Sequence, residues 1–211
     1  MKDDAFVSSR DFQVPSRRPD KTVFRTAEAV REVFTEAVGS KIYWATLIYL
    51  VSLAEHAFLD LARKFLLHDP RRFLIDNGSK KIEAKMIVDA GNFETLLEQM
   101  ADLILHDLSY QKPADQMKYF EKVFGISFRQ ELAAQWFEIK ATRDILVHNG
   151  GMANGIYIQK AGSQARVACG EMLPIDRKYF HHVVVTLKSL VGGVCSAVQL
   201  KLKADALKNK A

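Results

Sequence analysis

Residues 40–68 read SKIYWATLIYLVSLAEHAFLDLARKFLLH, and this stretch decides the fold class. Its apolar side chains recur at steps of three and four residues, as they do on one wide face of a long helix. Ser40 can cap the start of this helix, and Pro70 ends it because proline disfavours helical geometry in the residue before it. The apolar run from Ile42 to Ala54 is too short to span a bilayer, so we predict a buried central helix.

The same periodicity predicts further helices on both sides of this segment. Capping residues mark several of their ends, such as Asn92 at the start of one helix and Gly125 at the stop of another. The predicted helices cover residues 22–38, 92–108, 113–124, 127–147 and 176–200. Residues 71–91 read as a loop with a short helical piece. The sequence therefore predicts an all-α helical bundle.

A minor irregular insert follows the helix at residues 127–147. In it, residues 156–158 and 166–169 are rich in β-formers and flank Gly162-Ser163, so they are able to pair as a small hairpin. A helical turn is the alternative. We therefore predict a minor insert in the bundle that is either irregular or a hairpin.

Length and composition predict one domain. With 211 residues, 48% hydrophobic and 26% charged, the chain has the composition of an ordinary globular protein with a full core. Residues 1–21 lack a sustained apolar period and are expected to form a mobile arm before a single domain at residues 22–200. Residues 201–211 form a basic tail, whose four lysines against one aspartate supply three of the five net positive charges. The folded body is thus almost neutral.

The sequence also argues against several classes of protein. Cys169 and Cys195 lie far apart without a Cys-x-x-Cys pair, which disfavours a zinc site or a disulfide framework. The first residues, Met-Lys-Asp-Asp, carry no apolar core of signal-peptide length, so we expect a cytoplasmic protein that does not contact a membrane. We expect no cofactor and no metal.

The segment from Phe137 to Gly151 reads FEIKATRDILVHNGG and is the one place where chemistry is plausible. Arg143 falls on the apolar stripe of its helix, and burying an unpaired guanidinium is costly, so it needs an acidic partner, a phosphate or a subunit interface. Asp144 and His148 are four residues apart and share a face, which allows the carboxylate to orient the imidazole. An arginine and an imidazole together can stabilise and deprotonate a phosphodiester without a metal.

The spacing of Arg143 and His148 limits this idea. Five residues correspond to about 140° around a regular helix, so the two side chains converge only if the last turn unwinds before Gly150-Gly151. An arginine and a histidine before Asn-Gly-Gly are also typical of a plain helix stop. In that alternative, Glu55 of the central helix is a candidate partner for Arg143, and the pair is structural.

The string from Arg143 to Asn149 resembles the Arg-x4-His signature of the HEPN superfamily, a group of helical domains found in RNase toxins and antiviral defence proteins. With the two glycines that follow, and with Tyr157 and Gly162 further on, it looks like a bacterial HEPN subgroup whose motif ends in His-Asn-x-Gly. The resemblance implies a HEPN-like bundle and a metal-independent endoribonuclease. It also implies a homodimer in which two motif helices form one composite cleft.

The resemblance assigns roles to individual residues. It makes His148 the general acid and base and Arg143 the group that stabilises the phosphate. Asp144, in a polar position that is often Asn in the family, would orient the histidine. We expect Asn149 and Lys140 to contact the RNA substrate.

Such a protein is expected to act as a toxin or a phage-defence effector, with a neutralising antitoxin as a possible partner. The alternative is a catalytically inactive HEPN-like module that binds RNA or another protein. A phosphotransferase acting on nucleotides is a third, more distant possibility.

Overall fold

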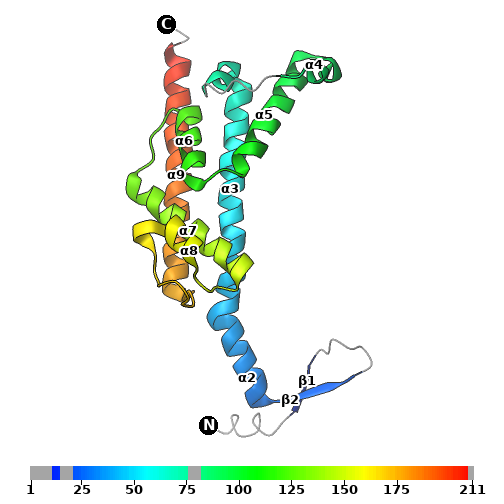
Figure 1. Cartoon of the computed structure of the whole chain (residues 1–211), viewed down its shortest axis with the longest axis vertical. Coiled ribbons are helices and arrows are strands. Elements are labelled where there is room, and N and C mark those ends of the chain that lie inside the picture. Colours follow the sequence, from blue (N-terminus) through cyan, green and yellow to red (C-terminus); the bar gives the residue numbers. More distant parts are fainter. Residues whose placement is uncertain (1–10, 15–20, 76–81, 209–211) are drawn as a thin grey trace.

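The computed structural model describes residues 11–14, 21–75 and 82–208, with side chains up to residue 203 (Figure 1). The chain is an all-α protein, as predicted. The central helix α3 (Ile42–His68) runs through the middle of the molecule, and the last helix, α9 (Arg177–Lys208), lies along it. Around α3 are packed α5 (Phe93–Ser109), α6 (Pro113–Phe124) and α7 (Gln130–Asn149).

The core is built on the face of α3 that the sequence predicts. One side chain in every three or four points inward, and this buried set consists of Leu47, Val51, Ala54, Phe58, Ala62, Phe65 and Leu66. Helices α5, α6, α7 and α9 all pack on this part of the molecule, which places the end of α7 beside the first half of α3.

Capping residues in the sequence predicted several helix ends correctly. The Asn92 side chain accepts a hydrogen bond of 2.8 Å from the backbone amide of Thr95 at the start of α5. Helix α6 begins at Pro113 and ends at Gly125, whose φ of 61° is left-handed. Helix α9 is longer than expected, because it continues through the basic segment as far as Lys208.

The N-terminal region differs from the prediction. Strand β1 (Asp11–Val14) pairs antiparallel with strand β2 (Val23–Thr26), so part of the expected mobile arm is an ordered hairpin, while residues 1–10 and 15–20 lie outside the described residues. The first helix, α2 (Ala27–Glu36), begins only after this hairpin, and the Thr26 side chain caps it.

The predicted stop at Gly39 is wrong. Residues Ala37–Lys41 form one π-helical turn, so α2, this turn and α3 make a single continuous helix. Ser40 does not cap a new helix, because its hydroxyl donates to the carbonyl of Glu36 within the turn. One helical glycine costs only about 1 kcal/mol relative to alanine, which is too little to break a helix that both flanks support.

The predicted hairpin after α7 is also wrong, and its alternative, a helical turn, is found instead. Residues Gly155–Ala161 form helix α8, followed by the 3-10 turn η3 (Gly162–Gln164). The Asn154 side chain caps α8, and Tyr157 is fully buried in the core, so the periodicity of a helix prevails over the β-forming residues. Further short elements are η2 (Pro70–Leu74) and α4 (Ala84–Ala90).

Within the part of the chain that the structure describes, two helical stretches, Ala27–His68 and Arg177–Lys203, are long and apolar enough to cross a membrane by length and composition. The prediction considered only the apolar run of residues 42–54, whereas the helix that contains it is continuous from Ala27 to His68. The core helix of a protein that never enters a bilayer meets the same criterion. Membrane contact and cellular location therefore stay predictions.

Candidate functional site

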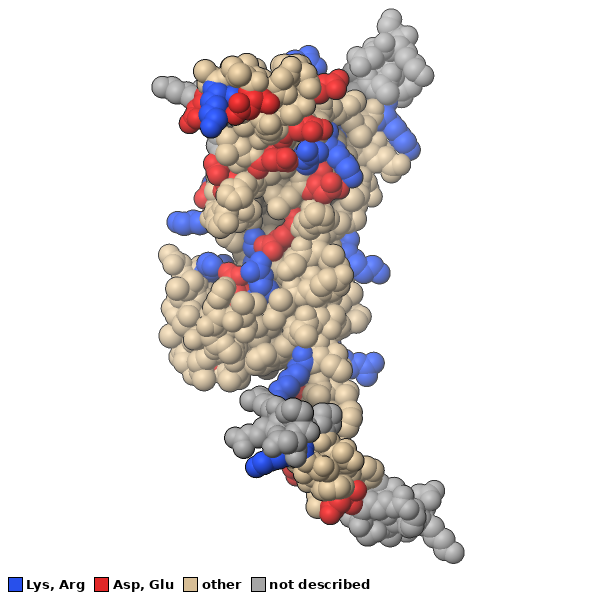
Figure 2. All heavy atoms as spheres, turned by 90° about the vertical axis from the view of Figure 1, so that its right-hand side faces the viewer, with Lys and Arg blue, Asp and Glu red and all other residues tan. Residues whose placement is uncertain are grey.

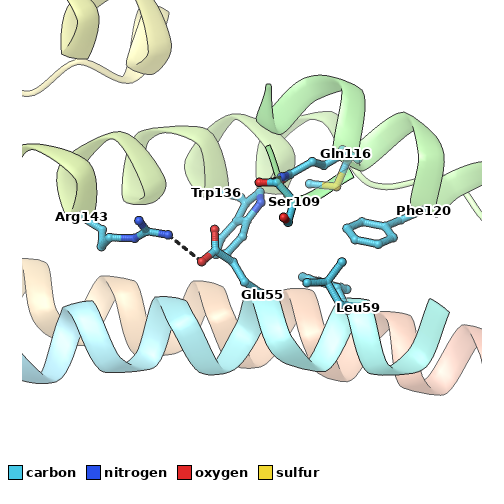
Figure 3. A pocket seen from close by; sticks show the side chains of 9 residues that line it. Glu55, Leu59, Ser109, Gln116, Phe120, Trp136 and Arg143 are labelled. Carbon is cyan, nitrogen blue, oxygen red and sulfur yellow. Dashed lines mark hydrogen bonds and ion pairs between the residues drawn. The ribbon is translucent and has the colours of Figure 1, made fainter. Parts of the chain in front are cut away.

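A chain of ion pairs links α3, α7 and α8 around Arg143. The Arg143 Nη2 atom lies 2.6 Å from Oε2 of Glu55 (Figure 3). The other oxygen of Glu55 lies 2.7 Å from Nζ of Lys140. The Nη1 atom of Arg143 lies 3.0 Å from Oδ1 of Asp144, whose Oδ2 is 2.8 Å from Nζ of Lys160. Three cations and two carboxylates thus alternate along one line, and the cluster carries one net positive charge.

This geometry confirms the expected pairing of Arg143 with Glu55. Glu55 follows the buried Ala54 on α3 and lies on the flank that contacts α7. The side chains of Glu55 and Arg143 are 25% and 22% exposed, so both charges are largely withdrawn from water and depend on each other. The need of Arg143 for an acidic partner is met within its own chain.

Lys140 and Asn149, the residues expected to contact substrate, both have partners within the chain. The Lys140 side chain is 8% exposed, and its Nζ donates to Oε1 of Gln116 as well as pairing with Glu55. Asn149 donates from Nδ2 to the carbonyl of Met152 and so closes the turn after α7. The ammonium group of Lys140 and the Nδ2 atom of Asn149 thus have structural partners within the chain.

His148 is exposed, and its side chain forms no hydrogen bond or ion pair with the described residues. The expected contact with Asp144 is not formed, because Arg143 and Lys160 occupy both oxygens of that carboxylate. Helix α7 stays regular through Asn149, so its last turn does not unwind. Arg143 and His148 therefore remain about 140° apart on one helix, and a single chain does not bring them to one point.

Glycine is required where α7 ends. Gly150 closes the helix with a φ of 57°, and Gly151 follows with a φ of 86°. A Cβ atom on Gly151 would lie 2.8 Å from Cη2 of Trp44, closer than real carbon contacts. The end of α7 is thus held directly against α3 at Trp44.

A small cavity of about 140 Å³ lies beside Glu55 and Arg143 (Figure 3). Its wall is formed by Glu55, Phe58, Leu59, Ser109, Gln116, Met117, Phe120, Trp136 and Arg143. The Nε atom of Arg143 is buried and has no hydrogen-bond partner, which is costly in an interior. Drug-sized ligands occupy roughly 300–1,000 Å³, so this cavity is too small for a nucleotide.

A larger recess of about 510 Å³ lies where the α5–α6 junction meets α7 and α8. Its lining combines two aromatic rings, Tyr110 and Phe137, with two lysines, Lys112 and Lys160. Lys160 also belongs to the ion-pair chain, so the recess adjoins the Arg143 cluster. Its size and lining suit a planar anionic group.

A second polar network, centred on Glu138, was not predicted. Glu138 is 3% exposed and accepts hydrogen bonds from Thr142, Tyr157, Tyr179 and Arg166, at 2.7, 3.1, 2.8 and 2.9 Å respectively. Its spacing from Thr142 puts both on one side of α7, but the other three partners come from distant segments. No pattern in the sequence connects them.

Arg166 completes this network. Its guanidinium donates to the carbonyl of Pro174 and stacks on the ring of Tyr179 at 3.4 Å. The loop after α8 and the start of α9 are thereby fixed to α7. A buried carboxylate with this many partners is satisfied, and we assign it a structural role.

We expect the stability of the fold to decline above about pH 10, the ordinary pKa of tyrosine. Burial raises the pKa of Tyr157 and, more strongly, that of Tyr179, so in the unfolded chain both phenols lose protons first. The stabilisation that comes from keeping these two phenols protonated is present below pH 10. It is lost as the pH rises toward the pKa values of the two tyrosines in the folded protein. Urea unfolding as a function of pH measures this decline. The double variant Tyr157→Phe/Tyr179→Phe should show a shallower one, and an equally steep decline would contradict the assignment.

The charged surface gives little guidance. On the face shown in Figure 2, acidic and basic side chains are mixed over the upper half of the molecule, and they do not form an uninterrupted basic stripe. Among the described residues, no group of three or more His, Cys, Asp or Glu side chains is placed to hold a metal ion.

Comparison with known proteins adds no assignment to this site. Neither the family models nor the curated proteins nor the solved structures give a match to the chain.

Proposed function

We propose that the chain is a metal-independent endoribonuclease of the HEPN type that acts as a homodimer. The observation that carries the proposal is the state of His148, which is exposed and free of partners at the end of the helix that bears Lys140, Arg143 and Asp144. A histidine without a structural task, next to a cluster with a net positive charge, is suited to proton transfer on an anionic substrate.

In this mechanism, the imidazole of His148 removes the proton of a ribose 2′-hydroxyl, which attacks the adjacent phosphorus. The bond to the 5′-oxygen breaks, that oxygen takes up a proton from an imidazolium, and the other product ends in a 2′,3′-cyclic phosphate. A guanidinium stabilises the extra negative charge of the pentacoordinate transition state. Because Arg143 and His148 point about 140° apart on α7, we propose that they act on one phosphodiester from different copies of the chain.

The recess beside Lys160 supplies a place for the RNA next to this site. Tyr110 and Phe137 offer rings on which a base can stack, and Lys112 and Lys160 can contact the backbone phosphates. Asp144 repels phosphate, but its charge is balanced by Arg143 and Lys160. The toxin or defence role, and a neutralising partner, follow from the resemblance alone.

The test is cleavage of a mixed RNA pool in the presence of a metal chelator. We expect the wild-type chain to cleave and His148→Ala to be inactive. Cleavage that depends on added metal, or that persists in the variant, would remove the proposal.

We further expect Lys112→Ala to weaken RNA binding several-fold and to lower the slope of log affinity against log salt by about 0.7, the value for one phosphate contact on a single strand. Filter binding at several salt concentrations measures both quantities. Lys188→Ala, which removes an exposed lysine of α9 far from the recess in sequence, is the control. An unchanged slope for Lys112→Ala would contradict RNA binding in the recess.

A second candidate is a non-catalytic module that binds RNA or a protein. It is favoured by the pairing of Arg143 with both Glu55 and Asp144 in its own chain, which makes this arginine structural. RNA binding without cleavage at any protein concentration would support this candidate over the nuclease.

A further inference from the structure

The recess at the α5–α6 junction is lined by two parts of the chain that carry the same three kinds of side chain. Each part supplies an aromatic ring, an amide and an ammonium group. The junction supplies them as the consecutive residues Tyr110, Gln111 and Lys112, and helices α7 and α8 supply them as Phe137, Gln159 and Lys160. Two rings, two amides and two cations therefore surround one space of about 510 Å³.

The amides of Gln111 and Gln159 have no task in the fold. Both residues are exposed, and neither side chain forms a hydrogen bond with another residue that the structure describes. Lys112 is likewise exposed and unpaired among the described residues. Lys160 has one ion pair, with Asp144 at 2.8 Å, and an ammonium group carries three N–H donors. The polar groups of the recess are therefore available to a ligand.

The two rings offer a flat ligand one fixed surface and one adaptable surface. Phe137 is half-buried and packs against the core, so its position on α7 is fixed. Tyr110 is 80% exposed, and its ring contacts only the imidazole of His106 among the described rings, at a centroid distance of 5.1 Å. A planar ligand that enters the recess can thus stack on Phe137 while the ring of Tyr110 turns to cover it.

Rings, amides and ammonium groups match the three chemical parts of a nucleotide in RNA. Aromatic rings stack on the face of a base, amides bind its polar edge, and lysines contact the phosphates on either side. The volume of about 510 Å³ falls in the range of roughly 300–1,000 Å³ that holds one ligand of this size. A base that is paired in a duplex presents neither its faces nor its Watson–Crick edge, so the nucleotide must be unpaired.

Two amides in one recess favour adenine. An amide presents a donor and an acceptor side by side, so it binds best where a base also has a donor next to an acceptor. Adenine has two such pairs that share its amino group, N6–H with N7 and N6–H with N1. Guanine presents two acceptors, N7 and O6, on the edge where adenine presents N7 and the amino group. Cytosine has only one such pair beside its amino group, and uracil has a single N–H donor.

We propose that the recess binds one unpaired adenosine of a single-stranded RNA, and that Gln111 and Gln159 determine the preference for adenine. The base stacks on the two rings, the two amides bind its edge, and the adjoining phosphates contact the two lysines. The proposed function places RNA in this recess, and the present inference adds which base it selects and which residues select it.

The selected base has a consequence for cleavage, which rests on the proposed function. Lys160 is paired with Asp144, and Asp144 is paired with Arg143, so an adenosine held by Lys160 lies beside the Arg143 cluster. We expect the chain to cut single-stranded RNA at a phosphodiester close to an adenosine, and to leave the same sequence intact within a duplex.

Fluorescence anisotropy with short 2′-O-methyl RNA probes tests the base preference without any cleavage, because these probes lack the attacking hydroxyl. Each probe is a strand of uridines with adenosine, guanosine, cytidine or uridine at its centre. We expect the full wild-type chain to bind the adenosine probe about tenfold more tightly than the other three, the discrimination expected from one well-placed amide pair. Equal affinity for the four probes, or no binding to any of them, would overturn the proposal.

Variants of the recess separate base selection from stacking. Gln111→Leu and Gln159→Leu should each reduce the preference for adenosine to about threefold or less, whereas Gln199→Leu, which changes an exposed glutamine of α9, is the matched control and should keep it. Tyr110→Ala should weaken all four probes about tenfold and leave the preference in place, and Tyr110→Phe should bind as the wild-type chain does. A full preference in both glutamine variants would refute their role.

Two further comparisons identify the ligand and separate this inference from the proposed function. Adenosine monophosphate that displaces the adenosine probe at an equal concentration would assign the recess to a free nucleotide and overturn the proposal for RNA. A preference for adenosine in binding without cleavage of RNA keeps the inference and removes the nuclease. Cleavage that requires His148 but is equally fast beside all four bases keeps the nuclease and removes the inference.

Discussion

Replacing Glu55 by glutamine should lower the free energy of unfolding by roughly 3–5 kcal/mol, the cost of removing one partner from a buried ion pair. Glu55 neutralises both Arg143 and Lys140, and the Lys140 side chain is only 8% exposed. The variant therefore leaves a buried Lys140 without a carboxylate and Arg143 with Asp144 alone. For a chain of this size, the melting temperature should fall by about 2–4 °C per kcal/mol. Urea unfolding and thermal melting of the purified variant measure the effect.

Glu36→Gln is the matched control. It makes the same change, from a carboxylate to an amide, in an exposed ion pair. The side chains of Glu36 and its partner Lys41 are 62% and 65% exposed, so the free energy of unfolding should change by less than about 0.5 kcal/mol. If Glu55→Gln unfolds at the same urea concentration as Glu36→Gln, the Arg143 cluster does not stabilise the fold.

Replacing His148 by alanine should lower the rate of RNA cleavage by about 10²- to 10⁴-fold, the range for removing a general acid or base. The same change should leave the melting temperature within about 2 °C of the wild-type value, because His148 is exposed and no described residue bonds to it. Cleavage under single-turnover conditions, measured beside a thermal melt of the same preparation, separates loss of chemistry from loss of fold.

His68→Ala controls for the loss of an exposed histidine near a helix end, since His68 is the last residue of α3. It should cleave RNA at the wild-type rate. A cleavage defect of equal size in both variants would indicate a general effect of histidine removal, and the role of His148 would be withdrawn.

The sequence predicted the regular parts of the fold because their signals are local. The apolar period of α3 and the ends of α5 and α6 depend on neighbouring residues, and each is found where expected. The errors at Gly39 and at residues 156–169 have a different origin. There, the outcome depends on support from flanking helices and on burial of Tyr157, which a short window of sequence does not contain.

The candidate site was predictable in part. The position of Arg143 on an apolar stripe implied an acidic partner, and Glu55 was named correctly. The expected Asp144–His148 contact is not formed, and Lys140, which was expected to contact RNA, is only 8% exposed. Spacing along one helix shows which side chains share a face but not which distant residues compete for them. Lys160 and Gln116 are those competitors.

The π turn at Ala37–Lys41 also bears on how such a protein can change over time. A turn that holds one surplus residue can lose it in a single codon deletion without disturbing the bundle below. Because the turn already absorbs that residue, the deletion would leave the N-terminal hairpin at nearly the same angle around the helix axis. A lineage could therefore gain or lose this residue while both ends of the long helix keep their orientation.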